Sequence, residues 1–155
     1  MPTAKRSALL STFWKIHKWI YVRSEGRLGS HIMGIQIVRL TTIGRRSGRP
    51  RSVMLYAFQA EANPVVVASN AGDDSHPLWF LNLKSNPNVT VDLSGSQFAA
   101  IARVAQGDER DRLWAEAIGA EPGYAEYQAQ IKRQIPVVVL ERKTEDASNP
   151  APAAN

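Results

Sequence analysis

Four arginines and two glycines crowd into one short stretch, Gly44–Arg51, which reads GRRSGRPR. Glycine permits turns with positive φ and a close approach of the backbone to a ligand, while guanidinium and backbone N–H groups donate to phosphate or carboxylate oxygens. The pattern therefore predicts an anion site, with a solvated charged hairpin as the alternative. Neither a Walker A loop nor GxGxxG is present, so nucleoside-triphosphate and Rossmann-type binding are not indicated.

Positive charge is concentrated in the first third of the chain. Residues 1–51 hold eleven Lys and Arg against one acid, whereas the remaining residues carry eight basic and thirteen acidic side chains, and the whole chain has a net charge of +5. This asymmetry favours an anionic partner, which could be nucleic acid, lipid headgroups or a phosphorylated ligand. No helix-turn-helix, zinc-finger or RNP pattern accompanies the charge, so nucleic acid is not the expected partner.

Other side chains suited to chemistry are sparse. The absence of cysteine excludes disulfides, thiolate metal ligands and a cysteine nucleophile. His17, His31 and His76 have no partner at metal-ligand spacing. Asp73 and Asp74, close to His76, are better explained as caps of a following helix, so no metal site is expected.

Aromatic side chains offer candidates for a pocket wall. Tyr124 and Tyr127 lie three residues apart on a predicted helix and share one face. Core packing explains such a pair, but a tyrosine hydroxyl can also donate to or orient a ligand. Trp79 and Phe80 on another predicted helix raise the same two options.

These residues need a scaffold, and the periodicity of the chain predicts one domain of class α+β. Alternating and β-branched residues predict strands at 35–43, 52–59, 64–69, 89–93, 97–105 and 137–140. Helices are expected at 76–84, 108–118 and 122–133, and a loop at 26–34. About six strands, joined largely by hairpins, favour a mostly antiparallel barrel with peripheral helices over a doubly wound sheet.

The N-terminal region, residues 1–25, contains a predicted amphipathic basic helix over 8–22. Its apolar stripe either packs on the domain or lies in a membrane interface, where Trp and Tyr settle at headgroup depth. No long apolar run or signal peptide is present, so we expect a cytoplasmic protein, with peripheral placement on the inner face of the cell membrane as the second possibility. The tail, residues 144–155, is expected to be disordered.

Three blocks of the sequence resemble a known family. LTTIGRRSGRPRSVMLYAF, VVVASNAGDDSHPLWFLNLKSNPNVTV and PGYAEYQAQIKRQIPVVVLER follow one another in the order found in deazaflavin-dependent nitroreductases, also described as F420H2-dependent quinone reductases. The resemblance implies a split β-barrel of the flavin-binding type over 26–143. It also implies the cofactor coenzyme F420, a deazaflavin with a phosphate and a polyglutamate tail, and hydride transfer to a quinone or nitroaromatic acceptor.

The resemblance also implies the site. Tyr124 and Tyr127 match aromatic positions of the family's substrate pocket. Our mechanistic hypothesis assigns Ser69 a hydrogen bond near the ring or the acceptor, and it makes Tyr124 and Tyr127 the candidates to orient the acceptor and relay a proton. The implied cofactor-binding residues are Arg45, Arg46, Ser47, Arg51, Ser52, Val53, Met54, Leu55, Tyr56, Val67, Ala68, Ser69, Asn70, Leu78, Trp79, Phe80, Leu81, Asn82 and Tyr124.

Two positions depart from the family pattern. Arg46 stands where the family often has lysine, which keeps the charge but changes the donor geometry. Glu121 stands where the nitroimidazole-activating member has a tyrosine, which puts that substrate in question. An FMN-binding split-barrel oxidoreductase is the main alternative, and a basic nucleic-acid-binding module is the second.

Overall fold

The structure, a computed structural model, describes residues 31–32, 35–60 and 63–144. Its strands are β1 His31–Ile32, β2 Ile35–Ile43, β3 Pro50–Ala60, β4 Asn63–Val67, β5 Asn88–Leu93, β6 Ser96–Val104 and β7 Val137–Arg142. Its helices are η1 Asn70–Gly72, α2 Leu78–Ser85, α3 Gly107–Ala120 and α4 Gly123–Gln130. The expected N-terminal helix and, apart from Thr144, the expected tail lie outside the described residues. Within these residues, no helix is both long enough and apolar enough to cross a bilayer.

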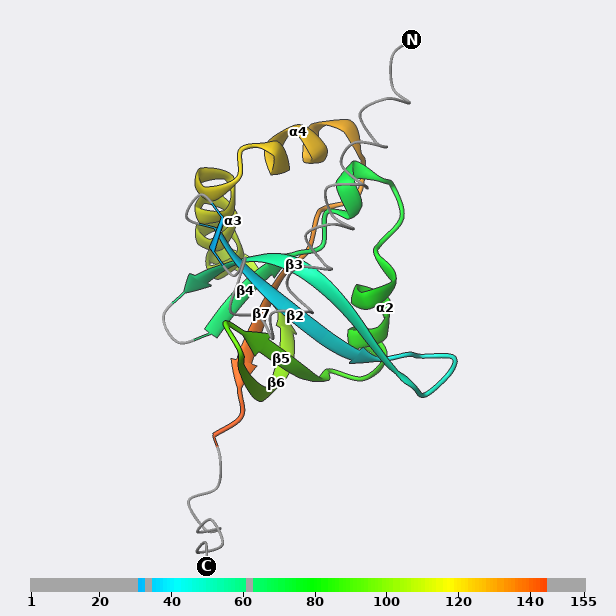
Figure 1. The fold of residues 1–155 in the computed structure, drawn as a ribbon. Helices are drawn as coiled ribbons and strands as arrows, with labels where there is room; N and C mark the ends of the chain where they lie inside the picture. Colours follow the sequence, from blue (N-terminus) through cyan, green and yellow to red (C-terminus); the bar gives the residue numbers. More distant parts are fainter. Residues whose placement is uncertain (1–30, 33–34, 61–62, 145–155) are drawn as a thin grey trace, which may run out of the picture.

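Six strands close into an antiparallel barrel. The strand order is β1-β2-β3-β4-β7-β6-β5, and β2 also pairs with β5 from Val38↔Leu93 to Thr41↔Thr90, which closes the barrel. Every pairing among the described strands is antiparallel. The expected α+β barrel of about six strands with peripheral helices is confirmed (Figure 1). The loop expected at 26–34 is wrong in part, because β1 forms there and extends the edge of β2.

The two valine-rich strands, β4 and β7, are buried on both faces, which explains their continuous apolar runs. Val138 and Leu140 of β7 point into the barrel, where they join the main core. The alternate residues, Val137 and Val139, pack instead against Leu113 of α3. One barrel wall thus separates the core from a second apolar layer under α3.

Helices cover the barrel in two places. Figure 1 shows α3 and α4 together beyond one end of the strands, and α2 beside the β2–β3 hairpin. In agreement, α3 contacts β3 and β7, α4 contacts η1, and α2 contacts β2 and β3. The helices therefore flank β3 from two sides.

Two helix boundaries differ from the prediction. The helix expected at 76–84 begins at Leu78, and the Pro77 carbonyl accepts its first bonds. Asp73 does not cap this helix, because its carboxylate accepts from the Ser75 backbone N–H at 2.8 Å in the preceding loop. That part of the prediction is wrong.

The helix expected at 122–133 ends at Gln130. The Gln128 side chain explains the early end, because it donates to the Arg133 carbonyl and accepts from the Ile135 N–H, both at 2.8 Å. These bonds hold residues 133–135 in a loop against the end of α4. Arg133 consequently leaves from a loop and not from a helix.

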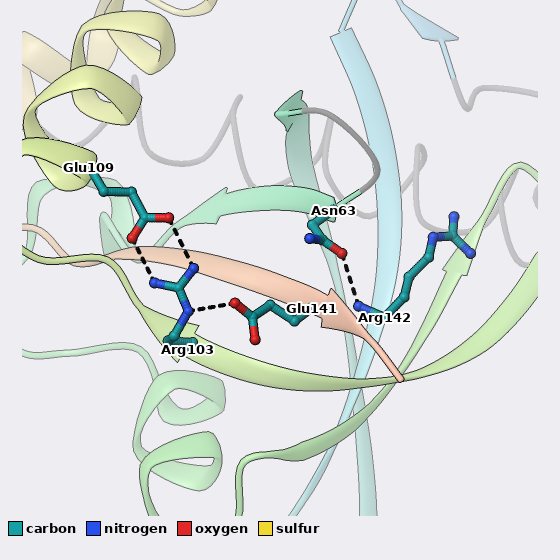
Figure 2. A network of polar contacts seen from close by, with 5 residues as sticks. All are labelled: Asn63, Arg103, Glu109, Glu141 and Arg142. Carbon is teal, nitrogen blue, oxygen red and sulfur yellow. Dashed lines mark hydrogen bonds and ion pairs between the residues drawn. The ribbon is translucent and has the colours of Figure 1, made fainter. Parts of the chain in front are cut away.

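An ion network joins α3 to the outer face of the barrel (Figure 2). Arg103 of β6 donates two bonds to Glu109 of α3, at 2.6 and 2.9 Å, and one to Glu141 of β7 at 2.7 Å. Close by, the Arg142 backbone N–H donates to the Asn63 side chain at 3.0 Å. The network fixes the start of α3 against two neighbouring strands.

Candidate functional site

A two-part groove runs along β3. Its parts adjoin because Val53 and Trp79 line both of them. The basic compartment, about 480 Å³ in volume, is lined by Gly44, Arg45, Arg46, Ser47, Arg51, Ser52, Val53, Leu78, Trp79 and Asn82. The aromatic compartment, about 450 Å³, is lined by Val53, Met54, Leu55, Tyr56, Val67, Ser69, Asn70, Ala71, Pro77, Trp79, Glu121, Tyr124 and Tyr127.

The arginines of the basic compartment form no ion pair with the described part of the chain. Arg45, Arg46 and Arg51 are exposed and line it. In the part of the chain that the structure describes, these three and Arg49 take part in no ion pair. Planar guanidinium groups with free donors bind phosphate or carboxylate oxygens in a bidentate manner. An anion in this compartment would therefore meet unsatisfied donors.

The turn between β2 and β3 depends on its glycines. The Gly44 N–H donates to the Arg49 carbonyl and the Gly48 N–H to the Gly44 carbonyl, both at 2.8 Å. Gly48 has φ of 66°, a left-handed conformation that L side chains rarely adopt. A Cβ on Gly44 would lie 2.5 Å from the Ser47 Oγ and 3.3 Å from the Arg49 carbonyl oxygen. The glycines thus let the turn fold tightly and present its arginines.

The Asn82 side chain of α2 hydrogen-bonds to the turn between β2 and β3. Its side-chain oxygen accepts from the Arg45 backbone N–H at 3.1 Å, and its amide nitrogen donates to the Thr42 hydroxyl at 3.2 Å. Only 7% of Asn82 is exposed. Because both polar ends are used within the protein, this side chain holds the arginine turn against α2.

Three tyrosines and one carboxylate define the aromatic compartment. Tyr56 comes from β3, Tyr124 and Tyr127 come from α4, and Glu121 precedes α4. Glu121 is held in place, because its Oε1 accepts from the Gly123 N–H at 3.0 Å. It is the only charged side chain among the described residues that line this compartment. The two compartments therefore carry opposite charge.

Burial raises the pKa of two tyrosines of this compartment. Burial raises the pKa of Tyr124 well above its usual range, and Glu121, Tyr56 and Tyr127 add to the rise. The pKa of Tyr56 is raised as well, first by burial and then by Glu121 and Tyr127. Protonated hydroxyls at these positions can donate hydrogen bonds to a ligand oxygen near neutral pH.

Most of the residues expected from the sequence lie together along the groove. In the basic compartment these are Arg45, Arg46, Ser47, Arg51, Ser52, Val53, Leu78, Trp79 and Asn82. In the aromatic compartment they are Met54, Leu55, Tyr56, Val67, Ser69, Asn70, Tyr124 and Tyr127, with Val53 and Trp79 shared. Ala68, Phe80 and Leu81 line neither compartment. Ala68 and Phe80 are buried in the main core, to which the groove-lining Trp79 also belongs.

Sequence reasoning did not place four other lining residues in the site: Gly44, Ala71, Pro77 and Glu121. Gly44 is part of the Gly44–Arg51 motif, so the motif could have placed it in the site. Ala71 and Pro77 have side chains without distinctive chemistry, and only the fold brings them to the pocket. Glu121 was noted only as a departure from the family pattern.

The groove is suited to an elongated ligand with an anionic end and a flat, mostly apolar end. Positive donors lie at one end, and aromatic and apolar walls with hydroxyl donors at the other. Among the described residues, no group of three or more His, Asp or Glu could hold a metal ion. The residues present suit binding and orientation of two ligands in contact.

Residues 13–142 match the family model described as F420H(2)-dependent quinone reductase. A Mycobacterium tuberculosis protein named F420H(2)-dependent quinone reductase Rv1261c is 36% identical over 135 residues, which cover 83% of this chain and 89% of that protein.

Two solved structures are also similar. One, titled as an F420-H2 dependent reductase (FDR-A), has a TM-score of 0.64 and 40% identity, covering 68% of this chain and 93% of the other. Another, described as a domain-swapped dimer, has a TM-score of 0.67 and 34% identity, covering 84% and 98% of the two chains.

Proposed function

This chain belongs to the F420H(2)-dependent quinone reductase family, and on that premise we propose that its groove binds coenzyme F420 with the anionic end in the basic compartment. Reduced F420, when bound, supplies the hydride that its deazaflavin ring transfers to a quinone, so the protein is an F420H2-dependent reductase. The residues present fit this cofactor. Arginines that form no ion pair with any described residue suit its phosphate and polyglutamate tail, and aromatic and apolar walls suit its ring.

The observation that carries the proposal is the opposite character of the two adjoining compartments. Arg45, Arg46 and Arg51 bind the anionic groups, and the Asn82 bonds keep this turn in place. Glu121 at the other end repels the same groups. One orientation of an elongated anionic ligand is therefore favoured.

The chain's own groups at the aromatic end orient the reacting partners. Ser69 donates a hydrogen bond near the ring or the acceptor, and Tyr124 and Tyr127 donate to an acceptor oxygen. The apolar walls exclude water, which strengthens these hydrogen bonds. Since the raised pKa of Tyr124 keeps its hydroxyl protonated, this side chain acts as a donor over the physiological pH range.

We extend the proposal to nitroaromatic acceptors. These resemble quinones in being flat, electrophilic and uncharged, and the compartment offers apolar walls with hydroxyl donors. Turnover of menadione and of a neutral nitroaromatic compound is measured side by side. Reduction of menadione alone would restrict the acceptors to quinones.

A peripheral membrane contact through the N-terminal segment is also proposed, on the sequence alone. Trp14, Trp19 and Tyr21 together with Lys15 and Lys18 suit an anionic membrane interface. Sedimentation with anionic liposomes is compared for the full chain and for a chain lacking residues 1–21. Equal sedimentation of the two would contradict the proposal.

A cofactor titration tests the central proposal. Purified protein is titrated with oxidised F420, FMN and duplex DNA, and binding is followed by fluorescence. We expect binding of F420 that exceeds binding of FMN, and F420H2 oxidation on addition of menadione. Tight binding of FMN without F420 would assign the groove to a flavin-binding oxidoreductase, and salt-sensitive binding of DNA alone would assign the arginines to nucleic acid.

A further inference from the structure

Arg133 lines neither compartment, and its guanidinium binds the back of the turn that forms one wall of the aromatic compartment. It donates to the Asp73 carbonyl from Nε at 3.1 Å and from Nη2 at 2.9 Å. It also donates to the Ser69 carbonyl at 2.9 Å and the Ala68 carbonyl at 3.2 Å. One side chain therefore ties together both ends of the segment 68–73.

The segment that Arg133 holds has an unfavourable backbone conformation. Asn70, Ala71 and Gly72 have φ of 48°, 53° and 79°, so three successive residues are left-handed. Non-glycine residues rarely adopt this conformation, and it persists where surrounding contacts enforce it. Within the turn, the Gly72 N–H donates to the Ser69 carbonyl at 3.0 Å and the Asp73 N–H to the Asn70 carbonyl at 3.1 Å. The Asn70 side chain also donates to the Ser75 carbonyl at 3.0 Å, and the Ser75 N–H donates to the Asp73 carboxylate at 2.8 Å. The bonds from Arg133 add a constraint from outside the turn, at both of its ends.

The same turn places two side chains of the proposed site. Ser69 itself lines the aromatic compartment. The ring of Tyr127 packs directly on Gly72, where an added Cβ would lie 2.9 Å from the Tyr127 Cδ1. A shift of the turn would therefore move both the Ser69 hydroxyl and the Tyr127 ring.

We propose that Arg133 is a positioning residue, which fixes the left-handed turn 69–73 and thereby sets the positions of Ser69 and Tyr127 in the aromatic compartment. The proposal rests on the proposed function, because it assigns these two side chains to the acceptor side of the reaction. Arginine suits the role since its planar fork carries several N–H groups in fixed directions, whereas a lysine ammonium cannot satisfy three carbonyls in the same geometry.

The first measurement is amide hydrogen exchange on the full chain without cofactor. Arg133→Lys and Arg133→Ala are compared with Arg110→Lys, a matched control whose guanidinium donates to the Ile135 carbonyl at 2.9 Å outside both compartments. In both Arg133 variants we expect the Gly72 and Asp73 amides to exchange at least tenfold faster, with no change in the barrel strands. The control should match the wild-type protein over residues 69–75.

The second measurement separates cofactor binding from turnover. The Arg133 variants should bind F420 within about threefold of wild type, because the arginine turn lies in the other compartment. Their kcat/KM for menadione should fall at least tenfold, and Arg133→Lys should not restore it. The exchange data would overturn the proposal if residues 69–75 exchanged at the wild-type rate, or if exchange became faster throughout the barrel. The kinetic data would overturn it if Arg133→Lys restored turnover, or if a loosened turn left the kinetics at the wild-type level. A wild-type protein inactive toward F420H2 refutes the proposed function, while the exchange data still decide whether Arg133 holds the turn.

Discussion

At the scale of single residues, the arginines of the β2–β3 turn differ in where they lie. Arg45 and Arg46 line the basic compartment, whereas Arg49, in the same turn and equally exposed, does not. Replacing Arg45 or Arg46 by Ala should therefore weaken F420 binding about three- to tenfold at low salt and less at high salt, since exposed charges are screened. Arg49→Ala is the control, and fluorescence titration at two ionic strengths is the measurement. Equal losses in all three variants would indicate a general charge effect.

Glu121 should control the charge of the acceptor. It is the only charged side chain among the described residues of the aromatic compartment, and its carboxylate is fixed by the Gly123 N–H. Glu121→Gln keeps an oxygen that accepts this bond but removes the charge. We expect kcat/KM for a sulfonated quinone to rise about tenfold relative to kcat/KM for neutral menadione, because like charges repel in a partly desolvated site. An unchanged ratio would show that Glu121 does not act on the acceptor.

Tyr124 should make the free energy of unfolding depend on pH in the alkaline range. Its pKa is raised in the folded protein by burial, so the folded state binds this proton more tightly than the unfolded state. The resulting stabilisation is complete below the unfolded tyrosine pKa of about 10 and declines above it, by about 1.4 kcal/mol per pH unit for this group. Tyr124→Phe should lose this part of the slope in urea unfolding measured from pH 8 to 11. A parallel decline in both proteins would mean that Tyr124 does not cause it.

The sequence predicted the site residues with distinctive chemistry better than the residues that hold them in position. The arginine motif and the paired Tyr124 and Tyr127 are visible in the chain, and the structure places them along one groove. Arg133 could not be found in this way, because its partners are backbone carbonyls that meet it only in the folded chain. The sequence also predicted Arg133 to lie in a helix, whereas it makes these bonds from a loop.

At the scale of elements, α2 supports the arginine turn through one buried amide. Asn82→Ala removes the acceptor of the Arg45 N–H and the donor to the Thr42 hydroxyl. Loss of bonds to a buried side chain should destabilise the protein by about 1–3 kcal/mol, measured by urea unfolding, and weaken F420 binding as well. Ser85→Ala, at an exposed position of the same helix, should change neither quantity. Destabilisation without weaker binding would separate Asn82 from the arginine turn.

Element types were predictable from the sequence, whereas element ends were not. The apolar runs of β4 and β7 and the Gly- and Pro-bearing turn before β3 predicted strands that the structure contains. The ends of α2 and α4 depend instead on side-chain bonds to the backbone of nearby residues. Asp73 accepts from Ser75 in a loop, and Gln128 binds the segment after α4. Both contacts are local, but they compete with helix capping and helix continuation, and propensity alone does not say which contact forms.

At the scale of the whole molecule, the barrel core determines stability while the groove lies on its surface. Leu140 is fully buried in the main core, whereas Ile101 on the neighbouring β6 is 43% exposed. Leu140→Ala should lower the free energy of unfolding by about 2–5 kcal/mol, and Ile101→Ala by less than about 1 kcal/mol, measured by urea unfolding. F420 affinity of the folded variants should stay within twofold of wild type. Equal destabilisation at the two positions would contradict this division of roles.

The closure of the barrel was the part of the fold that sequence patterns alone could not specify. Hairpin pairs such as β2–β3 and β5–β6 follow from short connections. The pairs β2–β5 and β4–β7 join strands far apart in the chain, and their register depends on which faces are buried. The pattern of hairpins favoured an antiparallel barrel, but it did not say which strands close it.

Strand β3 also sets the distance that one ligand must span to contact both ends of the groove. Arg51 at one end of the groove and Tyr56 at the other are five residues apart on an extended strand, about 17 Å at 3.4 Å per residue. A ligand that contacts the chain beside Arg51 and beside Tyr56 at the same time is therefore elongated, whereas a small acceptor occupies one compartment. The backbone of one strand thereby sets the separation of the two compartments, so that ligand length contributes to selectivity together with side-chain chemistry.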